Sequence, residues 1–253
     1  MSAAATPAPD TIPAGLLEAL RQAGRVVFLT GSGVSAESGV PTFRDEMTGL
    51  WARYRPEELA TPEAFRRDPM LVWNWYRERR RHVAAARPNP AHHAIARLQE
   101  ALPGSLLVTQ NVDGLHQRAG SHDVVEFHGN LFRNRCRECG HETLHPDPEL
   151  ESPPACPRCG HPMGPGVVWF GEAIPDDALK QAWRASAVAD VFFSIGTSGL
   201  VFPAAQLVEV ARWGGAVIVE VNTADTALSS SADYVLRGPA GVMMPRLQQQ
   251  LGS

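Results

Sequence analysis

Apolar residues gather in short runs along this chain, and each run ends in small or polar residues. Five runs predict buried strands of a parallel sheet, at 26–29, 105–109, 124–127, 191–195 and 216–221. Amphipathic spacing predicts helices beside these strands, at 11–22, 90–102, 177–188, 204–213 and 242–250. This alternation is typical of a doubly wound parallel α/β sheet, in which ligands bind at the carboxyl ends of the strands.

One long stretch departs from the alternation. Residues 57–86 show helical spacing with no strand between the helices, and the helices break near Pro62 and Pro69. Proline begins a helix more readily than it continues one, so these positions predict separate helices. We therefore expect a helical insertion in the α/β domain.

The four cysteines follow the pattern C-x2-C-x16-C-x2-C, at Cys136, Cys139, Cys156 and Cys159. This spacing is typical of a zinc ribbon, and a Gly-His pair follows each half of it. Four thiolates complete a tetrahedral shell and leave no position for water, which predicts one structural zinc ion. The alternative, a catalytic zinc, would require a cysteine to dissociate.

The composition of the chain excludes some classes of protein. The 253 residues, 44% of them hydrophobic, suffice for one large α/β domain with a smaller inserted module. A net charge of −4 argues against a nucleic-acid partner, and the absence of a long apolar run argues against a membrane. Residues 1–10 are rich in Ala and Pro and lack the features of a signal peptide, so we expect a disordered tail and a reducing, cytoplasmic location.

A glycine-rich loop follows the first predicted strand. Gly31, Gly33 and Ala36 fit G-x-G-x-x-A, a dinucleotide-binding pattern in which glycines let the backbone approach a pyrophosphate. A tight turn before a helix is about as good an interpretation of this pattern alone. The acidic second strand of a standard Rossmann unit is missing, which predicts a nucleotide site of unusual build. Phe43 and Arg44, later in the loop, suit stacking and phosphate pairing.

Polar residues stand at the ends of the later strands. Asn111 and Asp113 offer an amide and a carboxylate, although a turn with a helix cap explains them equally well. His128 also ends a strand, and Gly129 after it would leave room for a substrate. A histidine there can act as a general base near neutral pH, whereas a lone histidine is more often structural. The other candidate histidines, His92, His93, His116 and His122, are assigned to the surface or core.

Two further strand ends carry candidates. Residues 196–198, Gly-Thr-Ser, suit phosphate contacts, with a simple loop as the alternative. Asn222 can bond the hydroxyls of a ribose.

These motifs resemble the sirtuins, the NAD-dependent protein lysine deacylases, over nearly the whole chain after the first dozen residues. The matching segments are the loop at 30–45, the T-Q-N-V-D-G-L-H run at 109–116, the G-E-x-x-P segment at 167–175 and Gly-Thr-Ser at 196–198. Ser32 stands where the family usually has Ala. The resemblance implies NAD as a co-substrate and acylated protein lysines as substrates.

The resemblance also implies roles for individual residues. His128 would deprotonate a ribose hydroxyl, Asn111 would assist catalysis, and Asp113 would hold the nicotinamide carboxamide. The implied NAD-binding residues are Gly31, Ser32, Gly33, Ser35, Phe43, Arg44, Gln110, Asn111, Asp113, Gly196, Thr197, Ser198, Asn222 and Ala240. The implied residues of the peptide cleft and acyl tunnel are Val168, Phe170, Gly171 and Glu172, with 200–202 as the facing edge.

Tyr76 and Arg79 bear on the acyl group. They are three residues apart on a predicted helix, so they share a face and could bind a carboxylate together. A solvated, arginine-rich helix face is the alternative. The pair resembles the Y-x-x-R motif of sirtuins that remove succinyl and malonyl groups, and Thr42 stands where strict deacetylases usually have Asp.

We therefore divide the chain into four parts. These are a disordered tail at 1–10, a Rossmann-like NAD-binding domain at 11–50, 88–131 and 165–253, a helical insertion at 51–87 and a zinc-ribbon module at 132–164. Three rival functions share some of these features, namely a dehydrogenase, a protein mono-ADP-ribosyltransferase and a non-catalytic zinc-ribbon adaptor. The transferase is the main alternative because it uses the same NAD site and the same first chemical step.

Overall fold

The protein is built on a six-stranded, entirely parallel sheet with the order β3-β2-β1-β7-β8-β9. The computed structural model describes residues 11–41, 56–144, 147 and 149–252. The strands are β1 (Val26–Thr30), β2 (Ser105–Thr109), β3 (Val124–Glu126), β7 (Val191–Ile195), β8 (Val217–Asn222) and β9 (Tyr234–Arg237). The strand order reverses between β1 and β7, which confirms the doubly wound Rossmann-like sheet and places the binding crevice at their carboxyl ends.

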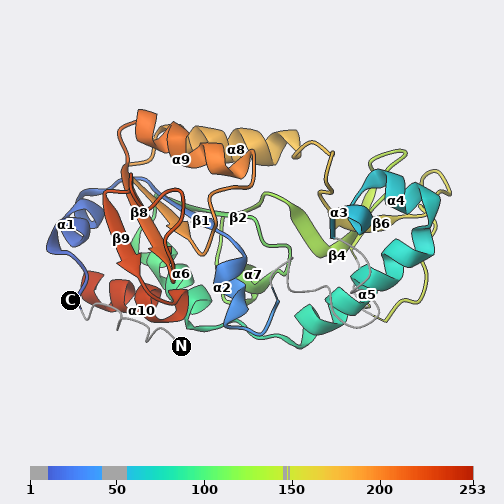
Figure 1. The fold of residues 1–253 in the computed structure, drawn as a ribbon, viewed down its shortest axis with the longest axis horizontal. Helices are drawn as coiled ribbons and strands as arrows, with labels where there is room; N and C mark the ends of the chain where they lie inside the picture. The colour runs from blue at the N-terminus through green and yellow to red at the C-terminus, as the bar shows by residue number, and fades with distance from the viewer. Residues whose placement is uncertain (1–10, 42–55, 145–146, 148, 253) are drawn as a thin grey trace.

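Helices cover both faces of this sheet because successive strand side chains point to opposite sides. Val26 and Phe28 pack on one side with α1 (Ala14–Gln22), α6 (Pro90–Ala101) and α10 (Ala240–Leu251). Val27 and Leu29 pack on the other with α8 (Asp176–Ala187) and α9 (Ala204–Trp213). Figure 1 shows α8 and α9 along one face, with α6 and α10 opposite.

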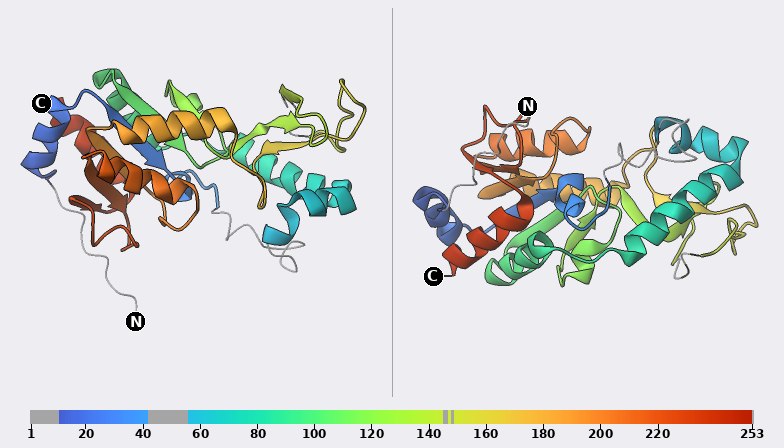
Figure 2. Two further views of the ribbon diagram at one scale, coloured as in Figure 1. Left: turned by 90° about the horizontal axis from the view of Figure 1, so that it is seen from above. Right: turned by 60° about the horizontal axis from the view of Figure 1, so that its bottom comes forward.

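A smaller module lies beyond the carboxyl edge of the sheet (Figures 1 and 2). It combines an antiparallel sheet of order β5-β4-β6 with three helices that share its apolar core. Its elements are α3 (Pro56–Leu59), α4 (Pro62–Arg67), α5 (Pro69–Ala85), β4 (Gly129–Arg135), β5 (Glu142–Leu144) and β6 (Gly164–Val167).

The two predicted helix breaks are confirmed, and each has a cap. The Thr61 side chain accepts a hydrogen bond from Ala64 N at 3.1 Å, and Asp68 accepts from Leu71 N at 2.9 Å. Each capping residue is followed by the proline that starts the next helix.

The chain connects the small sheet to the large domain through the segment at 167–175. Val167 ends β6 in the small sheet, and the chain rejoins the large domain at α8. The small sheet also begins at Gly129, which pairs with Val167, rather than at 132. Within the described residues, no helix is long and apolar enough to cross a membrane.

Arginine supplies most of the cations in the ion pairs between described residues. The single lysine of the chain, Lys180, lies on the exposed side of α8. Its Nζ is 3.3 Å from Asp176 Oδ2, one helical turn earlier.

Candidate functional site

Three glycines bring the loop after β1 against the end of β7. Gly31 N donates to Ile195 O at 3.0 Å, and Gly33 N donates to Gly196 O at 2.9 Å. A Cβ on Gly31 would lie 2.8 Å from Gly196 O, and one on Gly33 would lie 2.8 Å from Gly196 Cα. Glycine is therefore required here for the close approach of two backbones, which forms the floor of the crevice.

Beside this floor, Ser35 joins Asn111 and Asp113 in one buried network. Ser35 Oγ donates to Asp113 Oδ2 at 2.7 Å and accepts from Asn111 Nδ2 at 2.9 Å. The same Asn111 nitrogen donates to Gly31 O at 3.0 Å. Both amide hydrogens of Asn111 are therefore used, so its side chain can offer a ligand only the acceptor Oδ1.

Asp113 both caps a helix and belongs to the buried network at the candidate site. Its Oδ1 accepts from Leu115 N at 2.9 Å and caps α7 (Leu115–Arg118), while its Oδ2 faces Ser35. The residue is only 4% exposed, and burial raises the pKa of its carboxyl group. Hydrogen bonds from Leu115 and Ser35 act in the opposite direction and favour the carboxylate.

Two histidines assigned to surface or core lie directly behind this network. His92 Nδ1 accepts from Asn89 N at 3.2 Å, so its Nε2 carries the hydrogen and points to Ser35 Oγ at 3.5 Å. Burial lowers the pKa of His92 to about 4, which keeps it neutral. His116 Nε2 lies 3.0 Å from Thr30 Oγ1, and burial holds its pKa well below the usual value.

A sequence signal for His92 was available. Asn89 caps α6, Pro90 begins the helix, and His92 occupies the third helical position, where it completes a capping box. That pattern indicates the orientation of the His92 ring at the start of the helix.

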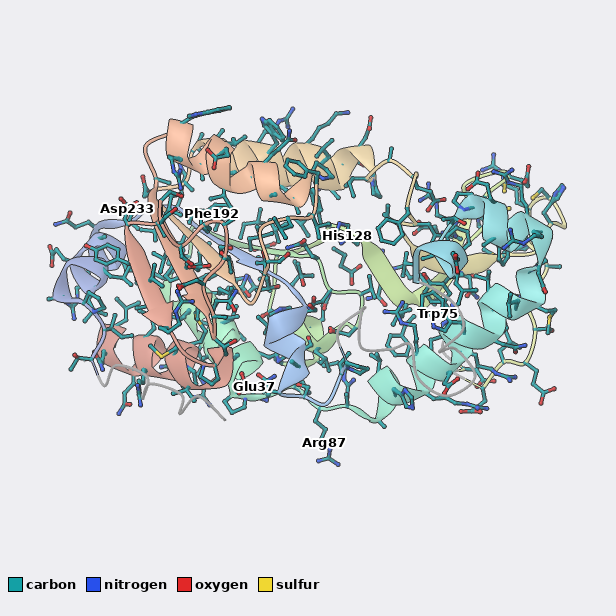
Figure 3. All side chains as sticks on the ribbon, viewed as in Figure 1. Glu37, Trp75, Arg87, His128, Phe192 and Asp233 are labelled. Atoms are coloured by element: carbon teal, nitrogen blue, oxygen red, sulfur yellow. The ribbon has the colours of Figure 1, made fainter. Side chains whose placement is uncertain are left out.

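His128 stands between the large sheet and the small module (Figure 3). Its Nδ1 is 3.1 Å from Gln110 O. A carbonyl only accepts hydrogen bonds, so Nδ1 carries the proton and Nε2 keeps its lone pair. Burial lowers the pKa of His128, against a smaller opposing effect of the Gln110 hydrogen bond. These features suit a general base.

Gly129 lies where β4 and β6 come close together. A Cβ at this position would clash with the backbone of Gly166, and the residue has φ of +79°. The pairing of β4 with β6 thus requires glycine at this position.

The ends of β7 and β8 bring together further predicted NAD-binding residues. Asn222 Nδ2 donates to Thr197 O at 2.9 Å, and this bond ties the two strand ends. Ser198 is exposed beside them, and Ala240 is buried at the first position of α10. Ser32 is exposed as the first residue of α2 (Ser32–Ala36).

The predictions for Thr42, Phe43 and Arg44 lie outside the described residues.

Tyr76 and Arg79 are neighbours, as predicted from their spacing. The Arg79 Cζ lies 5.3 Å from the centroid of the Tyr76 ring and 5.0 Å from that of Trp75. Tyr76 is 1% exposed, and its hydroxyl accepts a hydrogen bond from Trp169 Nε1 at 3.0 Å. A phenol both donates and accepts hydrogen bonds, so this hydroxyl has the chemistry to donate to a carboxylate.

Backbone hydrogen bonds to other parts of the protein fix the predicted peptide-binding segment. Val168 N donates to His128 O and Phe170 N to Ala60 O, both at 2.9 Å. The carboxylate of Glu172 turns inward, where Oε2 accepts from Trp169 N at 2.9 Å. Glu172 therefore shapes the turn.

Apolar side chains are exposed on the two sides predicted to face a peptide. Phe170 is 48% exposed on one side, beside the exposed Gly171. Leu200 and Phe202 are 60% and 71% exposed on the other.

The four cysteines converge in the small module. Their Sγ atoms all lie within 4.8 Å of one another, with Cys136 and Cys159 at 3.4 Å and Cys139 and Cys156 at 3.6 Å. Zinc–sulfur bonds of about 2.3 Å in a tetrahedron require sulfur separations of about 3.8 Å. Gly140 and Gly160 have φ of +72° and +78° and close the two matching turns, as predicted. The cluster fits one structural zinc ion.

Known proteins match both the sequence and the fold. The Sir2 family profile matches residues 31–203. A protein of Methylococcus capsulatus named NAD-dependent protein deacylase is 51% identical over 244 residues, which are 93% of this chain and 96% of that protein. One of Aquifex aeolicus with the same name is 49% identical over 227 residues, or 89% and 95% of the two chains.

Solved structures of Sir2 proteins have the same fold as this chain. A Sir2 homologue in complex with NAD has a TM-score of 0.90 at 46% identity, covering 96% of this chain and 94% of that one. A Sir2 protein with a deacetylated peptide and 3′-O-acetyl ADP-ribose has a TM-score of 0.82 at 32% identity, covering 93% and 97%. Agreement over this share of the chain, in sequence and fold alike, confirms the resemblance seen in the motifs: this chain belongs to the Sir2 family.

Proposed function

We propose that this protein removes acyl groups from lysine side chains of proteins and consumes NAD as a co-substrate. The observation that carries the proposal is the orientation of His128, whose Nδ1–H is held by Gln110 O at 3.1 Å while Nε2 remains a free base. The similarity to relatives named NAD-dependent protein deacylase and to a Sir2 homologue in complex with NAD supports it.

The site residues suit the two halves of the reaction. The acyl oxygen of the lysine attacks the anomeric carbon of the nicotinamide ribose, and nicotinamide leaves. His128 then accepts the proton of a ribose hydroxyl, which attacks the acyl carbon, and water releases lysine and O-acyl-ADP-ribose. Asn111 supplies an acceptor to the ribose, and Asp113 supplies one to the nicotinamide carboxamide.

The pyrophosphate and the peptide have separate surfaces. Gly31, Gly33 and residues 196–198 would face the pyrophosphate, and Asn222 the adenosine ribose. The acyl-lysine peptide would lie between Phe170 and the exposed residues 200–202.

The acyl group is not limited to acetyl. Tyr76 and Arg79 present a phenol and a guanidinium side by side, which is the donor set for the carboxylate of a succinyl or malonyl group. We therefore propose that succinyl-lysine and malonyl-lysine are substrates together with acetyl-lysine.

Nicotinamide release tests the function. Wild-type protein is incubated with NAD and peptides that differ only in one lysine, which is free, acetylated or succinylated, and nicotinamide and peptide mass are measured. Release that requires the acylated peptide, with loss of the acyl mass, is expected. Release with an ADP-ribose mass added to protein would instead indicate the transferase, and reduction of NAD would indicate a dehydrogenase.

A further inference from the structure

Arg137 lies between two zinc-ligand cysteines in sequence, yet its side chain contacts the peptide-binding segment. Its Nη1 donates to Pro165 O at 2.7 Å, and its Nη2 donates to Val167 O at 2.8 Å. Its Nε donates to Glu172 Oε1 at 3.1 Å. Nη1 also donates to Arg135 O at 3.2 Å. One guanidinium thus binds three backbone carbonyls and a carboxylate, which only the planar fork of arginine can do.

The same guanidinium lies against Trp169. Arg137 Cζ is 3.8 Å from the centroid of the indole ring, which is a close cation–π contact. Trp169 is also fixed at its backbone, because its N donates to Glu172 Oε2 at 2.9 Å. Arg137 and Glu172 therefore clamp both the ring and the backbone of Trp169.

Trp169 connects this clamp to the acyl-specificity pair. Its Nε1 donates to the Tyr76 hydroxyl at 3.0 Å, and Arg79 lies beside the Tyr76 ring. Trp169 is 2% exposed and Tyr76 is 1% exposed, so neither side chain can move freely. A continuous series of contacts thus runs from the zinc knuckle through Arg137 and Trp169 to Tyr76.

The clamp is also largely shielded from water. The Arg137 and Glu172 side chains are 12% and 15% exposed. Removing one member of a buried pair leaves the other without its partner, which costs more than removing an exposed pair. Arg133, on β4 of the same module, pairs at 2.8 Å with Glu126 at the end of β3 in the large sheet. The Arg133 side chain is 45% exposed, so this arginine offers a matched comparison.

We propose that Arg137 is a positioning residue for the acyl-lysine site. From the zinc knuckle it fixes Trp169 and, through the indole N–H, the orientation of the Tyr76 hydroxyl. The inference rests on the proposed deacylase function, and it gives the zinc ribbon an indirect part in substrate binding, through Trp169 and Tyr76.

The test compares Arg137→Met with the control Arg133→Met. Peptide dissociation constants are measured by calorimetry for matched acetyl and succinyl peptides, together with kcat, KM, ADP-ribose affinity and zinc content. Arg137→Met should weaken succinyl-peptide binding about 10-fold or more, as expected for a lost charge-assisted contact. ADP-ribose affinity should stay within about 2-fold and zinc at one per chain, because neither the crevice nor the thiolates are altered.

A second variant keeps the test valid where Arg137→Met folds poorly. Trp169→Phe keeps a ring under Arg137 but removes the hydrogen bond to Tyr76, so it should raise KM for the succinyl peptide with a smaller effect on kcat. Unchanged peptide affinity in both variants, or an equal loss in Arg133→Met, would overturn the proposal. A failure of the proposed deacylase function would look different, because the wild-type protein would then bind the peptide without releasing nicotinamide. In that case the peptide dissociation constants of the variants would still test the role of Arg137.

Discussion

The Nδ1 atom of His128 lies 3.1 Å from the carbonyl oxygen of Gln110, so the imidazole has one tautomer and one orientation. This carbonyl belongs to the residue directly after β2, and the histidine follows β3, its neighbour in the sheet. The parallel pairing of the two strands therefore positions the base.

The first prediction concerns this base. His128→Ala should lower kcat by roughly 10²–10⁴ while NAD affinity changes only a few-fold, because the variant removes proton transfer and leaves the glycine crevice intact. His122→Ala, at an exposed histidine, is the control. Near-normal turnover of His128→Ala would exclude this residue from the mechanism.

The pH profile provides an independent measurement. Burial lowers the pKa of His128, so the base stays unprotonated at a pH where a free histidine would be half protonated. The acid limb of kcat/KM should therefore fall below about 6.5, the ordinary histidine value. An acid limb above that value would contradict the assignment.

A second prediction concerns nicotinamide. Asp113→Asn should weaken NAD and nicotinamide about 10-fold or more, because a buried carboxylate acceptor is replaced by a group that also needs an acceptor. ADP-ribose lacks the nicotinamide and should lose much less. The exposed Asp123→Asn serves as the control, and equal losses for all three ligands would refute the role of Asp113.

The zinc site gives a third prediction. Elemental analysis of the native protein should find one zinc per chain, and Cys139→Ala should lower both zinc content and thermal stability, since metal binding here is coupled to folding. Treatment with a chelator should reproduce the loss. Native protein without zinc, or a variant as stable as wild type, would count against a structural metal.

The fourth prediction concerns acyl selectivity. Arg79→Met should lower kcat/KM for a succinyl peptide by roughly 10- to 150-fold, the effect of about 1.5–3 kcal/mol for a lost charge-assisted bond. The acetyl peptide has no carboxylate and should change much less. Arg81→Met on the same helix is the matched control, because Arg81 is an exposed partner of Glu149.

Two outcomes would contradict this assignment. Parallel losses on both peptides would mean that Tyr76 and Arg79 only support the fold. A wild-type protein without any activity on succinyl-lysine would be a plain deacetylase.

The strands of the central sheet were predictable because apolar runs buried on both faces have a strong local signal. The predicted and observed bounds agree fully at 105–109 and 191–195. β9 was missed, since Tyr234–Arg237 is short and half-buried. β6 was also missed, because its glycines and proline are typical of loops, and only the long-range pairing with β4 makes it a strand.

In the candidate site, too, some residues were predictable from the sequence and others were not. Asn111, Asp113 and His128 were found from their places at strand ends. His92 and Arg137 were not, because each acts through residues far along the chain, Ser35 for one and Glu172 for the other. Sequence spacing reports neighbours on one helix or strand, whereas these contacts depend on how separate elements pack.

Lys180 is the single lysine of the chain, and this has a consequence for acylation of the protein itself. Reagents that acylate primary amines spare guanidinium groups, so such a reagent finds a single lysine amine in this chain. Its acylation would remove one solvent-exposed ion pair with Asp176, a loss of about 0.3–0.5 kcal/mol. Because arginine is the cation in most of the other pairs of the described residues, acylation of lysine side chains would leave those pairs intact.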